Sequence, residues 1–180
     1  MRHFGNPFIW LLRFRNRCGY GVHSPFAFKL ITEVMYERLP YYRFAQLDAD
    51  LPWLWRFRKK KVLHLFFRLT NWFQPQRTVF LGKCPLAQAY IAAACPRAVR
   101  QTEVPQCEDR QKALFFLESP DNKVIPVLHS ATMLVLDNLD KHHNRQWFAS
   151  LPAVVRFDLY DVGIAFFDPQ YHPQNYTVNF

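Results

Sequence analysis

The chain has 180 residues, a formal net charge of +9, 50% apolar residues, five glycines and 13 prolines. A chain of this length buries roughly 70% of its extended surface, and this composition excludes wholesale disorder and collagen-like or linker sequences. No apolar run approaches the ~18 residues of a membrane-spanning helix, and the first residues lack the pattern of a secretory signal. These features predict a globular cytoplasmic protein.

Basic and aromatic side chains are concentrated in the first part of the chain. Residues 1–77 hold 14 Lys or Arg against four Asp or Glu, whereas residues 78–180 hold nine against ten. The densest basic segment contains Arg56, Arg58, Lys59, Lys60 and Lys61. Two interpretations stay open: a helical layer with a solvated basic face, or a surface for an anionic partner, either nucleic acid or a membrane. A homo-oligomer is also compatible with the sequence.

Residues 1–77 read as a helical extension. The helical spacing of apolar residues, interrupted by Gly and Pro, predicts three helices. They span residues 7–17, Ser24-Pro25 to near Pro40, and residues 51–73. Ser24 is expected to cap the second helix, and Gln74-Pro75 to end the third.

After residue 77 short apolar strands alternate with helices. The predicted elements are a strand over 78–81, a helix over 85–95, a strand over 98–103, a helix over 107–118, strands over 123–128 and 131–137, and a helix from Asp140 to Leu151. Alternating residues near 155–159 and 176–180, with the run 164–167, predict further strands that pair antiparallel. The fold class is therefore α/β: a Rossmann-like, mostly parallel sheet with an antiparallel C-terminal edge, formed by residues 78–180 and preceded by the helical extension 1–77.

The turn after the first strand is the expected ligand site, because open α/β sheets bind ligands at the carboxyl ends of their strands. Gly82 follows that strand, and Glu103 comes 21 residues later, where an acid contacts the ribose hydroxyls of an adenosine cofactor. His129 follows the predicted strand 123–128, and its ordinary pKa near neutrality makes it the candidate general base.

Four segments resemble class I S-adenosylmethionine-dependent methyltransferases, particularly bacterial O-methyltransferase-like proteins with a helical N-terminal extension. They are RCGYGVHSPF at 17–26, FQP at 73–75, LVLDN at 134–138 and FDLYDVGIAFF at 157–167. The resemblance spans most of the chain and implies a cofactor site that includes Gly82, Glu103 and Asp137. It also implies that Asp137 and Asn138 match the acid-amide pair by which divalent-metal-dependent relatives hold their metal.

Two positions depart from the family's first-strand motif. Phe80 stands where the motif has an acid, and Leu86 stands at its second glycine. A phenylalanine offers no charge to the cofactor's ammonium group, and leucine adds bulk where the backbone needs to approach closely.

The metal site lacks a second acid, and the four cysteines (Cys18, Cys84, Cys95 and Cys107) show no zinc-like spacing, so we expect no metal. The departures at Phe80 and Leu86 predict a methyltransferase-like protein whose S-adenosylmethionine site has decayed and which acts by binding or scaffolding. An active O- or N-methyltransferase and a basic-surface binding protein are the alternatives.

Overall fold

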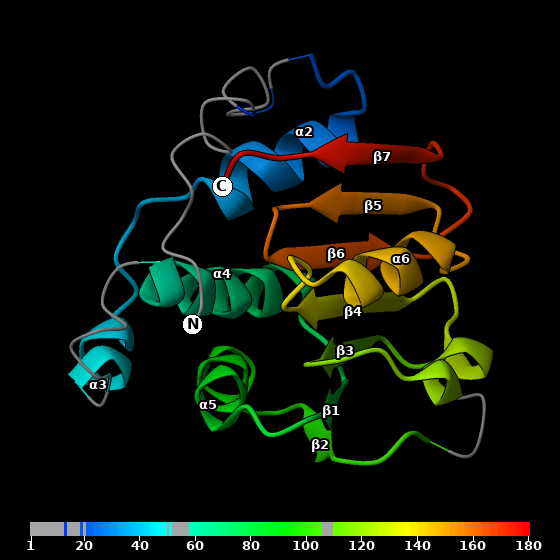
Figure 1. The fold of residues 1–180 in the computed structure, drawn as a ribbon. Coiled ribbons are helices and arrows are strands. Elements are labelled where there is room, and N and C mark those ends of the chain that lie inside the picture. Colours follow the sequence, from blue (N-terminus) through cyan, green and yellow to red (C-terminus); the bar gives the residue numbers. More distant parts are fainter. Residues whose placement is uncertain (1–12, 14–18, 20, 50, 52–57, 106–109) are drawn as a thin grey trace. The chain divides into compact units, whose positions relative to one another are not determined.

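The structure, a computed structural model, describes residues 13, 19, 21–49, 51, 58–105 and 110–180 (Figure 1). The helix predicted over residues 7–17 lies outside the described residues, except for Arg13. The helical elements are α2 (Pro25–Lys29), the π-helix η2 (Leu30–Met35), α3 (Phe44–Ala49), α4 (Arg58–Phe73), α5 (Pro85–Ala94), the 3-10 helix η4 (Asn122–Val127) and α6 (His142–Ser150). The strands are β1 (Arg77–Leu81), β2 (Val99–Gln101), β3 (Ala113–Leu117), β4 (Thr132–Asp137), β5 (Val155–Asp158), β6 (Val162–Phe166) and β7 (Gln174–Thr177).

These elements form two compact units, each assembled from separate parts of the sequence. The first unit contains the described residues of 1–72 together with Pro85–Pro96 and Asn179–Phe180. The second contains Phe73–Cys84 and Arg97–Val178. Helix α5 therefore belongs to the first unit although it lies between two strands of the second in the sequence. The division at residues 1–77 and 78–180 stays a prediction.

The predicted helix start at Ser24-Pro25 is confirmed. The Ser24 hydroxyl accepts a hydrogen bond from the Ala27 N–H at 3.4 Å, and Pro25 occupies the first helical position, where its missing N–H costs nothing. The helix then widens into η2, where the Tyr36 N–H donates to the Ile31 carbonyl oxygen. It ends there rather than near Pro40.

Helix α4 covers the second part of the helix predicted over 51–73, and residues 52–57 lie outside the described residues. It ends at Phe73, as predicted, because Gln74 has a φ of 49° and Pro75 follows it. Helix α3 was not predicted, since its six residues carry little periodic signal. No helix in the described part of the chain is both long and apolar enough to cross a bilayer.

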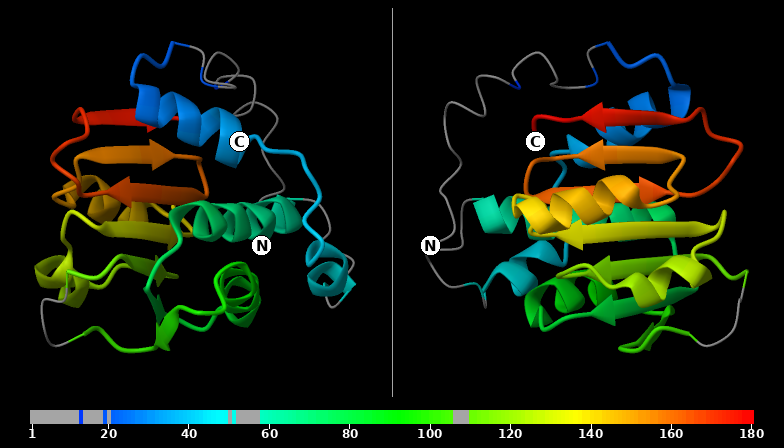
Figure 2. Two further views of the ribbon diagram at one scale, coloured as in Figure 1. Left: turned by 180° about the vertical axis from the view of Figure 1, so that it is seen from behind. Right: turned by 45° about the vertical axis from the view of Figure 1, so that its right-hand side comes forward.

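The second unit is built on a seven-stranded sheet of order β2-β1-β3-β4-β6-β5-β7 (Figures 1 and 2). Strands β2, β1, β3 and β4 are parallel, and β6 runs antiparallel to both β4 and β5. This arrangement confirms the predicted α/β fold and is consistent with a Rossmann-like class I methyltransferase topology. Strand β7, expected to pair antiparallel, instead pairs parallel with β5.

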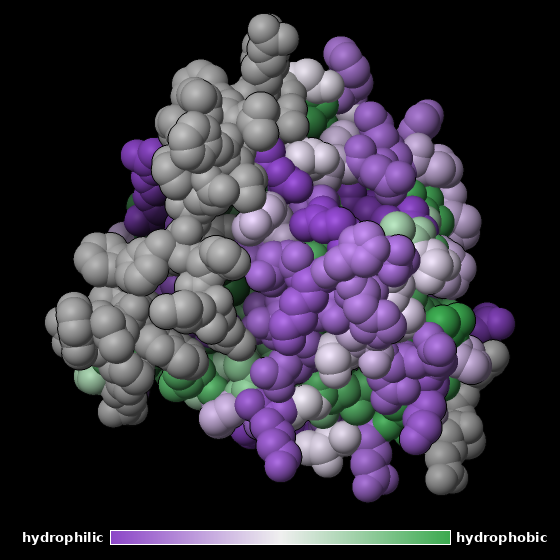
Figure 3. Space-filling view, viewed as in Figure 1, coloured by the Kyte–Doolittle hydropathy of each residue, from purple (hydrophilic) through white to green (hydrophobic). Residues whose placement is uncertain are grey.

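One face of this sheet is covered by η4 and α6 (Figure 2). The buried cluster on this face consists of Val79, Ala113, Phe115, Leu117, Val124, Leu134, Leu136, Leu139, Trp147, Phe148, Leu151, Ala165 and Phe167. Gly163 belongs to the same face, where a β-carbon would meet the Phe148 ring at 2.8 Å. The glycine thus lets α6 approach the sheet closely. The outer side of α6 is hydrophilic (Figure 3), with His142 and His143 exposed.

Two predicted elements are wrong. Part of the predicted helix 107–118 is strand β3, which pairs with β1 on one side and with β4 on the other. Its five residues, Ala113–Leu117, are all buried. A strand covered on both faces shows no alternation, so its apolar run can be mistaken for part of a helix. The predicted strand 123–128 is η4, in which Asp121 caps the Lys123 N–H and Pro126 has no N–H to offer a sheet.

The start of α6 also differs from the prediction. Lys141, rather than Asp140, is the N-cap residue, and its side chain forms no capping hydrogen bond. The connection is instead held by Asn144, whose Nδ2 donates to the Asn138 carbonyl oxygen at 2.9 Å.

Candidate functional site

The carboxyl ends of three parallel strands meet at one edge of the sheet. Leu81, Leu117 and Leu136 are neighbours in register on β1, β3 and β4. The next residues, Gly82, Glu118 and Asp137, therefore follow one another along this edge. The chain turns to opposite sides of β1 to reach β2 and β3, so the topological switch point lies between Gly82 and Glu118.

Glu118 occupies this switch point. Its Oε2 accepts a hydrogen bond from the Lys83 N–H at 3.0 Å, and its own N–H donates to the Leu81 carbonyl oxygen at 3.0 Å. Gly82 has a φ of +126°, and the three heavy atoms nearest to a β-carbon built on it all belong to Glu118, the closest at 2.6 Å. Because Gly82 has no side chain, Glu118 can pack directly against its backbone.

The network continues from Glu118 toward α6. Asn138, in a left-handed conformation with φ of 60°, donates from Nδ2 to the Glu118 carbonyl oxygen at 3.2 Å. The Asn138 carbonyl in turn accepts from Asn144, as described above. These bonds join the ends of β1, β3 and β4 and the start of α6. The arrangement fixes the turns at this edge and directs the Glu118 carboxylate to the loop after β1.

Phe80 and Leu86, the two residues that depart from the methyltransferase motif, lie in different elements and differ in burial. Phe80 is buried in β1, with its ring 6.4 Å from the ring of Phe116 on the neighbouring strand β3. It is a core side chain of the sheet. Leu86 is half-buried in the first turn of α5. The side chain found against Gly82 is thus Glu118, which the sequence interpretation did not single out.

Glu103 lies two residues beyond the end of β2 and is exposed. The structure gives no contact between Glu103 and Gly82 or Lys83 within the described residues. Its assignment to a ribose therefore stays a prediction.

Asp137 is buried at the end of β4, next to Asn138. The Asn138 amide donates from Nδ2 to the Glu118 backbone carbonyl, which fixes its side chain in the turn after β4. Across the described ranges, no three or more His, Cys, Asp or Glu side chains gather closely enough to hold a metal ion.

His129 lies at the amino end of β4, since it precedes Thr132. It is therefore at the opposite end of that strand from Asp137, and not at the carboxyl edge where the predicted strand 123–128 would have put it. Its Nδ1 accepts from the Ala131 N–H at 3.2 Å, and its carbonyl accepts from the Thr132 N–H at 2.9 Å. These bonds assign His129 a place in the turn before β4.

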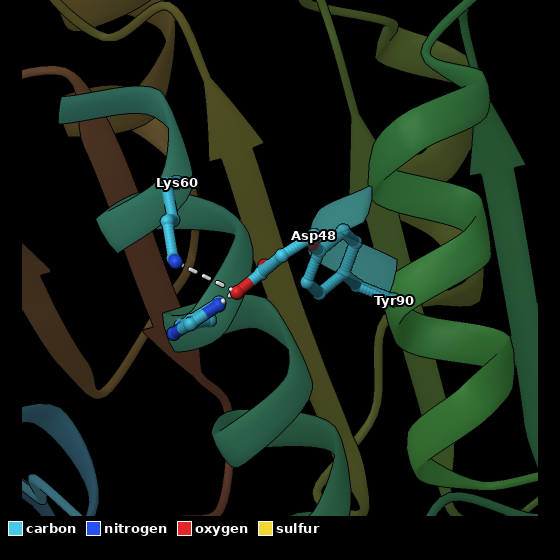
Figure 4. A network of polar contacts seen from close by, with 4 residues as sticks. Asp48, Lys60 and Tyr90 are labelled. Atoms are coloured by element: carbon cyan, nitrogen blue, oxygen red, sulfur yellow. Dashed lines mark hydrogen bonds and ion pairs between the residues drawn. The ribbon is translucent and has the colours of Figure 1, made fainter. Parts of the chain in front are cut away.

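A second polar cluster lies within the first unit, around Asp48 (Figure 4). The Asp48 carboxylate accepts from Tyr90 at 2.6 Å and contacts Lys60 Nζ and His64 Nε2 at 2.8 Å each. The His64 ring stacks on Phe44 at a centroid distance of 3.7 Å. One carboxylate thereby joins α3, α4 and α5.

In this cluster, burial and the hydrogen bonds among the side chains act in opposite directions on the pKa of Asp48, and also on that of His64. Burial raises the pKa of Asp48, but hydrogen bonds from Lys60, Tyr90 and His64 outweigh it, so the pKa lies below its ordinary value. Burial lowers the pKa of His64, and Asp48 only partly offsets this because Lys60 and Arg68 lower it further. The cluster is therefore an ionised carboxylate beside a histidine that is easily kept neutral, which suits a structural junction.

The basic segment is only partly described. Arg56 and the side chain of Arg58 lie outside the described residues. Lys60 is bound to Asp48, and Lys61 Nζ lies 4.2 Å from the centroid of the Phe180 ring. Lys59 is half-buried. Lys60 is thus paired with a carboxylate within the first unit, whereas the ring beside Lys61 carries no charge. The interpretation of this segment as a surface for an anionic partner stays a prediction.

Glu118 could have been found from one signal in the sequence. The run Ala-Leu-Phe-Phe-Leu is five apolar residues bounded by Glu-Ser-Pro, which is typical of a buried parallel strand ending in a turn. Reading it as a strand would have placed Glu118 at the same edge as Gly82.

Comparisons with known proteins returned no similarity to report: no family model, no curated protein and no solved structure matches the chain.

Proposed function

We propose that the chain is a methyltransferase-like module that no longer takes S-adenosylmethionine and acts by binding or scaffolding. The observation that carries this proposal is the position of Glu118. Its side chain lies against Gly82 and is bonded to the Lys83 N–H, at the switch point where an adenosyl cofactor of this fold class would need the loop. The space beside Gly82 is filled by Glu118, and the Lys83 N–H already donates its hydrogen bond to the Glu118 carboxylate. Neither is left for a cofactor.

Charge supports the same conclusion. A cofactor that entered this loop would have to displace a carboxylate from a backbone N–H, losing a charge-assisted hydrogen bond. The acid of the motif is replaced by Phe80, which is buried in the sheet and offers no compensating charge.

Calorimetry with S-adenosylhomocysteine tests the proposal on the full chain. We expect no saturable binding up to about 1 mM ligand, which corresponds to a free energy of binding weaker than roughly 4 kcal/mol. Glu103→Ala and Glu118→Gln should behave like the unmodified chain. Micromolar binding that either substitution abolishes would contradict the proposal and favour an active methyltransferase, in which Glu118 holds the ammonium group of the cofactor.

A further inference from the structure

The loop between η2 and α3, residues 37–43, exposes two large apolar side chains within four residues. The exposed fractions are 69% for Leu39 and 83% for Tyr42. Across the described ranges the other exposed large apolar residues, Phe28 and Val99, are separated from these in sequence. Single exposed apolar residues are ordinary on protein surfaces, but two large ones within four residues single out this loop among the described residues.

The base of this loop is anchored within the first unit. At its start, the Tyr36 hydroxyl donates to the Asn179 carbonyl oxygen. At its end, the Tyr41 ring packs on Phe44 and Phe67, with centroid distances of 5.3 and 4.9 Å. The inward residues are thus fixed while Leu39 and Tyr42 face solvent. Their exposure belongs to a supported loop, so little order has to be gained on binding.

The loop also carries positive charge. Arg43 donates from Nε to the Tyr42 hydroxyl at 2.8 Å and from Nη1 to the Ala93 carbonyl oxygen at 3.0 Å. Both acceptors are uncharged, so within the described residues these bonds orient the guanidinium without neutralising it. Arg38 adds a second cation, and the loop's acid, Glu37, accepts a hydrogen bond from Tyr41 at 2.9 Å.

We propose that loop 37–43 docks on the surface of an anionic lipid bilayer. Leu39 and Tyr42 enter the headgroup region, the exposed Arg38 contacts the anionic headgroups, and the charge of Arg43 adds to their attraction. An aliphatic residue, an amphipathic aromatic ring and arginines together suit this interface. Single-stranded nucleic acid fits less well, because bases stack on aromatic rings and an exposed leucine offers no such platform. The proposal goes beyond the proposed function and does not depend on the state of the Glu118 loop.

Vesicle sedimentation with the full chain tests this. The vesicles are phosphatidylcholine alone, or with about one third phosphatidylserine. We expect binding only to the anionic vesicles, weakening as salt rises to about 0.3 M. Leu39→Ser and Tyr42→Ser should each lower the partition coefficient about tenfold, since each removes a buried apolar side chain.

Val99→Ser combined with Arg100→Gln is the matched control, because it removes an exposed apolar residue beside a cation in the second unit. It should leave vesicle binding unchanged, and circular dichroism should show that all variants stay folded. Absence of binding to anionic vesicles, or full binding by Leu39→Ser, would overturn the proposal. So would retardation of a single-stranded RNA that Tyr42→Ser abolishes and Leu39→Ser leaves intact, since that result assigns the loop to nucleic acid.

Discussion

Gly82 shows how one residue can link backbone conformation to the chemistry of a site. Its φ of +126° is a conformation that side-chain-bearing residues rarely adopt, and the space where a β-carbon would stand is taken by Glu118. In nucleotide-binding α/β sheets, a glycine at the first strand-to-helix turn lets the backbone approach a bound ligand closely. Here the close approach is to a carboxylate of the same chain, so the glycine alone does not establish a cofactor site.

Gly82→Ala should therefore be strongly destabilising. Backbone strain and the 2.6 Å approach to Glu118 Cβ act together, and we expect a loss of about 2–3 kcal/mol in the free energy of unfolding. Urea denaturation measures this. Gly21→Ala is the matched control: it has a φ of +75° but nothing within 4 Å of the added carbon, so it should cost only about 1 kcal/mol. Equal losses in the two variants would show that Glu118 does not crowd Gly82.

The end of helix η2 is held by a side chain from helix α4. Arg68 of α4 is buried, and it donates from Nε to the Val34 carbonyl oxygen at 2.8 Å and from Nη2 to the Met35 carbonyl oxygen at 3.0 Å. These carbonyls belong to the last residues of η2, which have no partner further along the helix. One guanidinium thus ends η2 and joins it to α4, and its burial lowers its pKa.

Arg68→Ala should destabilise the protein by about 3 kcal/mol, because it leaves buried carbonyl groups without donors. Arg68→Lys should lose less, since an ammonium group keeps the charge but lacks the planar fork that reaches both oxygens. Chemical denaturation gives the free energies, and hydrogen exchange should show faster opening of η2 in both variants. An Arg68→Ala loss within about 0.5 kcal/mol would contradict this role.

The Asp48 cluster, which joins three helices, makes stability depend on pH. The pKa of folded His64 is below its ordinary value of 6.5, so between these two values the unfolded chain binds the proton more readily. Stability should therefore fall as pH drops below about 6.5. The pKa of folded Asp48 is also lowered, so its contribution is present above its ordinary pKa of 3.8 and is lost at more acidic pH.

Denaturation at pH 7.5 and 5.5 tests the histidine. The unmodified chain should lose more stability between these two pH values than His64→Gln, which has no titrating ring at this position. The quantity to compare is the change in the free energy of unfolding between pH 7.5 and 5.5, measured separately for each chain. This comparison is needed because the substitution also changes the absolute stability. Identical pH differences in both chains would exclude His64 as the group responsible.

For the whole molecule, the interleaving of the two units in the sequence has a consequence for folding. Helix α5 is grouped with the first unit, where Tyr90 binds Asp48 and the Ala93 carbonyl accepts from Arg43. Tyr90, Ile91 and Ala94 are buried. A fragment of residues 78–180 keeps α5 but loses Arg43 and Asp48.

We expect this fragment not to fold cooperatively on its own, because α5 would expose its buried side chains and leave its polar groups unpaired. Thermal unfolding followed by circular dichroism should be broad for the fragment and sigmoidal for the full chain. A cooperative transition together with well-dispersed amide signals from the fragment would establish residues 78–180 as an autonomous domain instead.

The sequence alone determined those parts of the fold in which local signals agree. Strands β1 and β4 are short apolar runs bounded by turn residues, α5 lies between two prolines, and Ser24-Pro25 marks a helix start. Their alternation predicted the α/β sheet, and the alternating C-terminal residues predicted the antiparallel pairing of β5 with β6. These features depend on neighbours a few residues apart, so periodicity records them.

Only the tertiary structure decided the rest. The apolar run Ala113–Leu117 became a strand because β1 and β4 pair with it on either side, a partnership that local propensity does not register. The bond between Lys83 and Glu118 joins residues 35 positions apart, and that between Asp48 and Tyr90 spans 42. Contacts at such separations follow from the register of strands and the packing of helices, because the hydrophobic pattern specifies which residues are buried but not which of them meet.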